Sequence, residues 1–327
     1  MPIRLIRWCR TRWKRVVVLG FVSGILSINL VAFLHARAFT HYAATGSALA
    51  KPENLSLAQK LGVLLTSASH PRPVNDRPPA DVELEFSTHV LPSHDESLEV
   101  WHVPCADVRM TVVLFHGHGA CKSGLLSEAK IFHELGCECL LVDFRGGGGS
   151  TGDRCTFGVA EARDVAAAVT WLRQRNSRLP IVLYGQSMGS AAILRAVGID
   201  EVKADALILE CPFDRLLTTV QHRFEAMGVP DFPMARLLLF WGGAQNGFDA
   251  FAHNPVDYAQ RVQIPTLIMH GATDPRVSTA EAKAVASSLS GPKAFHVFPD
   301  AGHESYCRHC SVEWREVGND FLKEQIK

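Results

Sequence analysis

The stretch Leu183-Tyr184-Gly185-Gln186-Ser187-Met188-Gly189-Ser190 places a serine between two glycines directly after a short apolar run. Residues 181–184 have the composition of a buried strand, and residues 190–197 can continue as a helix. Ser187 is therefore expected at a tight corner between strand and helix, where the backbone is strained and neighbouring chains crowd in. Residues without a β-carbon tolerate such crowding, so the two glycines let the serine hydroxyl stand clear of the sheet edge.

Short apolar runs bounded by turn residues recur on both sides of this corner. Continuous apolar strands are typical of a sheet that is covered on both faces. Helical patterns lie between them, and the clearest spans residues 157–175, where Ala162, Val165, Val169 and Leu172 form one apolar stripe. Strands that alternate with helices predict an α/β fold, with a mostly parallel sheet of about eight strands and helices on both faces. The expected strands are residues 82–88, 97–103, 111–117, 137–144, 181–185, 206–210, 266–271 and 294–298.

Two ionisable residues follow later strands at positions suited to activating the serine. A serine hydroxyl is a poor nucleophile, and it needs a base that is in turn oriented by an acid. Asp274 lies in the loop after the strand at 266–271, and His303 lies just beyond the strand at 294–298. In such sheets the chemistry gathers at the carboxyl ends of the strands. The order Ser, Asp, His is the chain order of the G-x-S-x-G hydrolases.

In this corner and this order the chain resembles the α/β-hydrolase superfamily, over about residues 82–325. It looks nearest to serine hydrolases with a single N-terminal anchor, relatives of the monoglyceride lipases and of the serine aminopeptidase-like, S33-type hydrolases. The resemblance implies that Ser187 is the nucleophile, that His303 is the general base and acid, and that Asp274 fixes the imidazole tautomer. It implies hydrolysis through an acyl-enzyme, with no cofactor and no metal.

Negative charge that develops on a carbonyl oxygen needs preorganised donors. The corner supplies the backbone N–H of Met188, and the second donor is expected in residues 115–123, which resemble the family's H-G-x oxyanion motif. His118 fits the x position through its main chain. The glycine-rich residues 143–153 resemble a family loop that supports the active-site floor. They lack the G-K-[ST] ending of a phosphate-binding loop, so nucleotide binding is not favoured.

Other residues compete for the acid and base. Glu210 ends the strand at 206–210, where some members of the superfamily place their acid, and Asp300 lies just before His303. His116 and His270 each stand in a His-Gly pair after a strand, and we expect them to shape loops. A membrane-tethered binding protein on a hydrolase scaffold is an alternative to an enzyme, although all three expected catalytic residues are present.

Eight of the nine cysteines follow the N-terminal apolar segment, and an even number outside a membrane would permit disulfides. Cys137 and Cys139 are two residues apart in an expected strand, which predicts buried packing on one face. Cys307 and Cys310 form a C-x-x-C pair around His309. This pair raises zinc binding or thiol redox chemistry as a further alternative, but a second ligand pair at zinc-like spacing is missing from the sequence.

The N-terminus joins a basic segment to an apolar one. Residues 1–35 carry six basic side chains and no acid, and residues 16–34 carry no charge. Nineteen helical residues span about 28 Å, close to the hydrocarbon thickness of a bilayer. We expect a single transmembrane anchor, a cytoplasmic N-terminus and an extracytoplasmic catalytic domain. A cleaved signal peptide is one alternative, because residues 36–38 resemble a cleavage site, and a buried core helix is another.

These segments divide the chain into the anchor at 1–35, a linker at 36–80 that is partly helical around 55–65, and a hydrolase domain at 81–327. Residues 212–261 are expected to form a lid, whose apolar run at 235–255 suits an acyl chain, although core packing explains the same residues. The basic excess is confined to the N-terminus, which argues against nucleic acid as a partner. We expect a carboxylesterase or lipase-like hydrolase of a hydrophobic acyl substrate, with a serine peptidase as the alternative.

Overall fold

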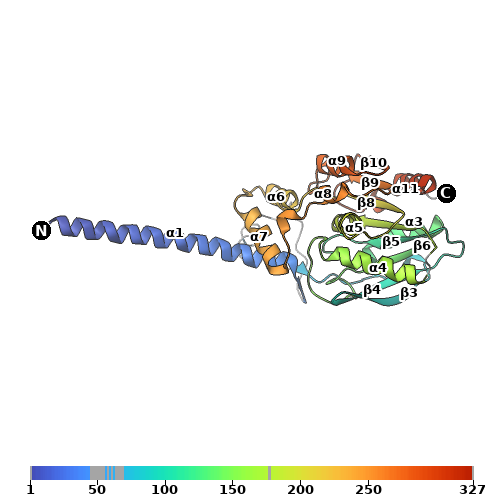
Figure 1. The fold of residues 1–327 in the computed structure, drawn as a ribbon, viewed down its shortest axis with the longest axis horizontal. Coiled ribbons are helices and arrows are strands. Elements are labelled where there is room, and N and C mark those ends of the chain that lie inside the picture. The colour runs from blue at the N-terminus through green and yellow to red at the C-terminus, as the bar shows by residue number, and fades with distance from the viewer. Residues whose placement is uncertain are drawn as a thin grey trace.

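The computed structural model describes residues 2–44, 56, 59, 62, 70–175 and 178–325, and the side chains of residues 2–12 and 325 are not described. A long N-terminal helix projects from a layered α/β body (Figure 1). The expected helical region around 55–65 lies almost entirely outside the described residues.

An eight-stranded sheet forms the centre of the body, in the order β10-β9-β8-β7-β5-β6-β4-β3. β4 pairs antiparallel with β3 and β6, and the other pairs are parallel. β5 and β8 are buried along their whole length, and β7 is buried up to its last residue, Gln186, which accounts for their continuous apolar sequences. The expected fold class is confirmed. The strands are β3 (Ser87–Ser93), β4 (Glu96–Val103), β5 (Met110–Phe115), β6 (Cys137–Val142), β7 (Ile181–Gln186), β8 (Ala206–Glu210), β9 (Thr266–Gly271) and β10 (Lys293–Phe298).

Helices cover both faces of this sheet. Val113 and Phe115 of β5 share a core with α4, α5, α8 and α9, whereas Val112 and Leu114 share the opposite core with α3 and α11. Successive strand residues point to opposite faces, so one strand supplies both cores. The helices of the body are α3 (Leu126–Glu134), α4 (Glu161–Arg175), α5 (Met188–Gly198), α6 (Leu216–Met227), α7 (Met234–Asn246), α8 (Pro255–Ala259), α9 (Thr279–Ser288), α10 (Tyr306–His309) and α11 (Ser311–Gln325), with short 3-10 turns η2 (Pro79–Val82), η3 (Lys122–Leu125) and η4 (Ala250–Ala252).

Two expected boundaries are wrong. The first strand begins at Ser87 and not at residue 82, because proline favours the first turn of a helix and Pro79 opens η2 instead. Glu83 then ends that turn with a φ of 63°. The helix expected from residue 157 begins at Glu161, since Phe157 and Gly158 adopt positive φ angles of 58° and 118°.

Helix α1 (Pro2–Thr40) ends beside the insertion between β8 and β9, which holds α6, α7, η4 and α8 (Figure 1). Phe33 packs edge-on against Trp241 of α7 with ring centroids 5.4 Å apart, and Trp241 Nε1 donates to Asn29 Oδ1 at 3.2 Å. Residues 13–40 of α1 are long and apolar enough to cross a membrane, with a mean hydropathy of 2.4 over an apolar stretch of 18 residues. Two short parallel strands, β1 (Tyr42–Ala43) and β2 (His70–Pro71), follow α1.

Candidate active site

Ser187 lies between β7 and α5, at the carboxyl end of the parallel strands. Its φ of 51° and ψ of −108° are strained for a residue that is not glycine. A β-carbon on Gly185 would lie 2.6 Å from the carbonyl carbon of Gly189, and one on Gly189 would lie 2.5 Å from the carbonyl oxygen of Phe115. Neither position has room for a side chain, so the expected reason for the two glycines is confirmed.

Asp274 and His303 meet at the same edge of the sheet. His303 Nδ1 bonds Asp274 Oδ2 at 2.7 Å, and Asp274 Oδ1 accepts the backbone N–H groups of Arg276 and Val277 at 2.8 and 3.0 Å. Burial alone would raise the pKa of Asp274, but His303 and the two amides outweigh it, so this pKa lies below its usual value. An ionised aspartate holds the imidazole proton on Nδ1 and leaves Nε2 as the proton acceptor. Among the described residues, no hydrogen bond joins the Ser187 hydroxyl to His303.

Cys211 lies beside Asp274 and His303, although no pattern in the sequence indicated that it belongs to this site. It follows β8, and its sulfur lies with one side-chain atom each of Asp274 and His303 within 4.8 Å of one another. Burial, and then the charges of Asp274 and Glu210, raise the pKa of the Cys211 thiol well above its usual value. Cys211 therefore presents a protonated thiol beside the acid and base, and a thiolate nucleophile is disfavoured.

The loop after β5, which carries His118, runs past the Ser187 corner. A β-carbon on Gly117 would lie 3.6 Å from Ser187 Cβ, so this loop passes directly beside the serine. The His118 ring stacks on Phe157 with centroids 4.7 Å apart. Burial, and then the charge of Arg223, lower the pKa of His118 well below its usual value, so the imidazole is neutral.

Glu210, the rival acid, points away from the histidine. Its Oε1 accepts Trp314 Nε1 at 2.5 Å, and its Oε2 accepts Gln186 Nε2 at 3.2 Å. Burial and the neighbouring Glu128 raise the pKa of Glu210 to about 8. Gln186 also donates to Glu128 Oε1 at 3.0 Å, so its amide joins two buried carboxyl groups directly behind Ser187. The other rival, Asp300, is exposed.

The two competing histidines are both buried, and their surroundings differ. His116 Nδ1 bonds the carbonyl oxygen of Gly117 at 2.8 Å, and its Nε2 accepts the N–H of Phe144 at 3.1 Å. It therefore ties the oxyanion loop to the glycine-rich loop, as expected for a residue that shapes loops. His270 is the second-last residue of β9, and neither of its ring nitrogens has a hydrogen-bond partner among the described residues. Burial lowers the pKa of both imidazoles.

A buried ion pair holds the start of the glycine-rich loop, at Asp143. Asp143 bonds Lys122 Nζ and accepts the Lys122 backbone N–H at 2.8 Å, and Glu99 accepts Lys122 Nζ at 2.7 Å. A β-carbon on Gly148 would lie 1.9 Å from Asp143 Oδ2, so glycine is required where this loop crosses the carboxylate. The glycine-rich loop therefore packs against the carboxylate of its own first residue, Asp143.

The eight cysteines from Cys105 to Cys310 carry free thiols. Cys137 and Cys139 are fully buried in one core, which confirms the packing expected from their spacing. Cys307 is buried and Cys310 is partly exposed. Neither belongs to a cluster of potential metal ligands among the described residues, in which Cys211, Asp274 and His303 form such a group.

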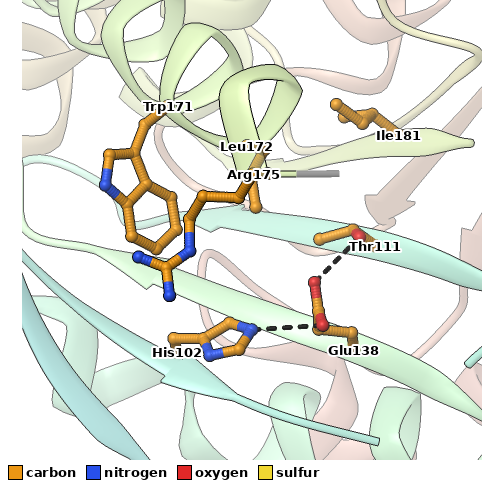
Figure 2. Close-up of a pocket in the computed structure, with 7 residues that line it drawn as sticks. All are labelled: His102, Thr111, Glu138, Trp171, Leu172, Arg175 and Ile181. Carbon is orange, nitrogen blue, oxygen red and sulfur yellow. Dashed lines mark hydrogen bonds and ion pairs between the residues drawn. The ribbon is translucent and has the colours of Figure 1, made fainter. Parts of the chain in front are cut away.

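A small hollow of about 80 Å³ lies at the opposite edge of the sheet. Figure 2 shows the residues that line it, with Glu138 bonded to His102 at 3.2 Å and to Thr111 at 3.1 Å. Thr111 and Glu138 are each the second residue of their strands, whereas Ser187 follows the last residue of β7. The hollow is therefore remote from the Ser187 corner.

The sequence matches the family model described as serine aminopeptidase, S33, over residues 106–237. The Bacillus subtilis protein YqkD is 25% identical over 245 residues, which cover 73% of this chain and 80% of that protein. Lysophosphatidylserine lipase ABHD12 of Danio rerio is 27% identical over 242 residues, which cover 68% of this chain and 61% of the lipase. This chain therefore spans less than two thirds of that lipase.

Among solved structures, the Pyrococcus furiosus esterase Pf2001 superposes with a TM-score of 0.67 at 21% identity, covering 79% of this chain and 97% of the esterase. This likeness concerns the fold. The family-model match covers the oxyanion loop and the Ser187 corner, whereas Asp274 and His303 lie beyond it. Their pairing is known here from the geometry of the two side chains.

Proposed function

We propose that this chain is a member of the α/β-hydrolase superfamily and a serine hydrolase that cleaves an acyl ester through an acyl-enzyme intermediate. Ser187 attacks the carbonyl carbon, His303 takes the hydroxyl proton and passes it to the leaving group, and Asp274 holds the imidazole in place. The observation that carries the proposal is the 2.7 Å bond between His303 and Asp274, at the same sheet edge as the strained Ser187 corner. The backbone N–H groups of Met188 and His118 serve as oxyanion donors.

The apolar lid supports a hydrophobic acyl chain as the substrate. A separate core cluster joins Ala191 of α5, Leu216 and Leu239 of the lid, and Val277, which follows Asp274 in the chain. It therefore lies between the lid and the loops of the proposed nucleophile and acid. Each CH₂ group of an acyl chain transferred to such surroundings gains about 0.8 kcal/mol. The similarity to a lysophosphatidylserine lipase favours a lipid ester.

A peptidase is the second candidate, because the matching family model is described as a serine aminopeptidase. Peptide and ester hydrolysis share the acyl-enzyme, so the triad does not distinguish them. A panel of p-nitrophenyl esters, acyl thioesters and aminoacyl amides does. We expect turnover of medium and long acyl esters to exceed that of aminoacyl amides, and the reverse order would favour the peptidase.

Labelling with a fluorophosphonate probe tests the nucleophile. The probe is expected to label the wild-type chain once, at Ser187, and to leave Ser187→Ala unlabelled. Ser190→Ala is a matched control, since the Ser190 hydroxyl is buried and bonds the carbonyl oxygens of Gly185 and Glu210 at 2.7 and 2.8 Å. Ser190→Ala should keep the label. Persistent labelling of Ser187→Ala would overturn the proposal.

We also propose that α1 is an uncleaved membrane anchor at residues 16–34, with a cytoplasmic N-terminus and an extracytoplasmic catalytic domain. The basic residues before the apolar segment favour this orientation. Cleavage at residues 36–38 would cut inside the helix, where Ala36 is buried near α7. Protease added to intact cells should therefore digest the catalytic domain. A domain that stays shielded until the membrane is permeabilised would contradict this topology.

A further inference from the structure

The segment that follows α1 enters the active site and touches the oxyanion loop. Tyr42 is 8% exposed, and its hydroxyl oxygen accepts the backbone N–H of Gly119 at 3.1 Å. Gly119 is the next residue after His118, whose main-chain N–H is the proposed second oxyanion donor. Because the peptide unit is planar, this bond restrains the unit between His118 and Gly119, which adjoins at the His118 α-carbon the unit that carries the His118 N–H. The tyrosine hydroxyl therefore limits how the donor loop can turn.

The side chain of His118 packs against the same segment. Its ring stacks on Tyr42 with centroids 6.0 Å apart and an interplanar angle of 29°. Its Nε2 lies 3.4 Å from the carbonyl oxygen of Phe39 at the end of α1. Since the imidazole is neutral, Nε2–H is the group that donates to this carbonyl. Both the side chain and the main chain of the loop are thus held from residues 39–42.

Tyr42 also reaches the other proposed donor. Burial, and then the neighbouring thiol of Cys155, raise the pKa of Tyr42 well above its usual value. The Cys155 sulfur lies 3.3 Å from the thioether sulfur of Met188. Met188 supplies the first oxyanion N–H from the start of α5. The Tyr42 hydroxyl therefore contacts the loop of His118 directly, and it is linked to Met188 through the thiol of Cys155.

The position of Tyr42 is itself fixed by the glycine-rich loop. The Tyr42 N–H donates to the carbonyl oxygen of Asp153 at 2.7 Å, and the Cys155 N–H donates to that of Thr40 at 2.9 Å. A β-carbon on Gly146 would lie 2.9 Å from Tyr42 Cδ2, so the ring occupies space that only glycine leaves open. The residues that leave the apolar helix are therefore built into the floor of the site.

We propose that Tyr42 is a positioning residue that holds both donors of the oxyanion hole, and that the end of α1 thereby forms part of the active site. This inference rests on the proposed function, because it requires the Met188 and His118 amides to bind an oxyanion. In this proposal Tyr42 acts through Gly119 and Cys155 and does not contact the substrate. The oxyanion exists only in the transition state and the tetrahedral intermediate, so loss of this alignment lowers kcat and leaves KM nearly unchanged.

Tyr42→Phe in the full chain, solubilised in detergent and assayed with a p-nitrophenyl ester, tests the proposal. The variant keeps the ring that fills the space over Gly146 and removes the hydroxyl alone. Removal of a direct oxyanion donor typically costs about 10²–10³ in rate, so misalignment of donors that remain should cost about tenfold in kcat. Tyr258→Phe is the matched control, because its hydroxyl is also internal and bonds Arg195 and His253 at 3.1 and 3.0 Å. The control should keep the wild-type kcat.

Inhibition by an alkyl trifluoromethyl ketone gives a second measurement, since its tetrahedral adduct places an oxyanion between the donors. Its inhibition constant should rise in Tyr42→Phe by the factor by which kcat falls. An unchanged kcat, or an equal fall in Tyr258→Phe, would overturn the inference. Ser187→Ala separates the two proposals: an inactive Ser187→Ala beside a fully active Tyr42→Phe refutes only the role of Tyr42, whereas a fully active Ser187→Ala refutes the proposed function itself.

Discussion

Replacement of Glu210 by glutamine separates the two candidate acids. Burial and the charge of Glu128 raise the pKa of Glu210 to about 8, so at pH 7 it is a neutral acid whose shape an amide reproduces. Glu210→Gln should therefore hydrolyse esters at close to the wild-type rate. Asp274→Asn removes the ionised partner of His303 and leaves the wrong tautomer, which costs up to about 10⁴ in kcat in a serine hydrolase triad.

Glu210→Gln should also stabilise the protein at alkaline pH. The direction and magnitude of this change in stability follow from the raised pKa of Glu210. The pKa of Glu210 is about 8 in the folded chain, against an ordinary value of 4.5. Between these two values the folded state binds a proton that the unfolded state has lost, so stability falls as the pH rises. The slope is about 1.4 kcal/mol per pH unit. From pH 6 to pH 8 the cost grows by roughly 2–3 kcal/mol, which is roughly 5–10 °C in Tm for a domain of this size.

Thermal melting of the detergent-solubilised chain at pH 6, 7 and 8 measures this cost. The difference in Tm between Glu210→Gln and wild type should grow steadily with pH. Glu83→Gln is the control, because Glu83 is exposed and its bond to Lys130 lowers its pKa, so it is ionised in both states throughout this range. Its Tm difference should stay constant. A constant difference for Glu210→Gln would refute the neutral acid, and lost activity in Glu210→Gln with an active Asp274→Asn would exchange the two roles.

Two further outcomes are expected elsewhere in the domain. Lys122→Met leaves Asp143 buried without its cation and should lower the free energy of unfolding by about 3–5 kcal/mol. Thermal melting measures this loss. A melting temperature within about 2 °C of wild type, about the scatter of such measurements, would contradict a stabilising role for the ion pair. Leu239→Ser should reduce kcat/KM for long acyl esters more than for acetyl esters, because Leu239 belongs to the apolar cluster under the lid. Phe240→Ser is the control: Phe240 is 53% exposed, so this variant should keep the wild-type kcat/KM for both esters. Equal losses on both esters in Leu239→Ser would assign that side chain to packing alone.

The parts of the site that sequence could predict are those that leave a local pattern. The Ser187 corner combines an apolar strand with two glycines, and each glycine is required by a contact shorter than 3 Å within or beside that corner. Ser187, Asp274 and His303 follow β7, β9 and β10 in that order, and the parallel sheet then brings the ends of these strands together. Composition and spacing suffice for both inferences.

The role of the segment after α1 could not be predicted in this way. Tyr42 and Gly119 are far apart in the chain, and a bond between a hydroxyl and a backbone N–H leaves no periodic signal in either stretch. Residues 36–80 look like a linker because, apart from a partly helical pattern around 55–65, they show no strand or helix pattern and end in a proline-rich stretch. Their described parts nevertheless contact catalytic loops, as with Asn75, which donates to Asp143 at 2.7 Å. The division of the chain into anchor, linker and domain remains a prediction.

The sequence also could not decide whether Glu210 or Asp274 partners His303, because that depends on the electrostatic environment of each carboxyl group. Both acids follow neighbouring parallel strands, so position alone makes them equivalent. The structure separates them by their partners: Asp274 faces an imidazole and two amides that favour its charge, whereas Glu210 lies beside Glu128 and is enclosed by Trp314. Environments that push two carboxyl groups apart in pKa assign them different tasks. In the proposed mechanism the ionised acid stabilises an imidazolium, and the neutral one accepts a hydrogen bond behind the proposed nucleophile without setting a second negative charge against the developing oxyanion.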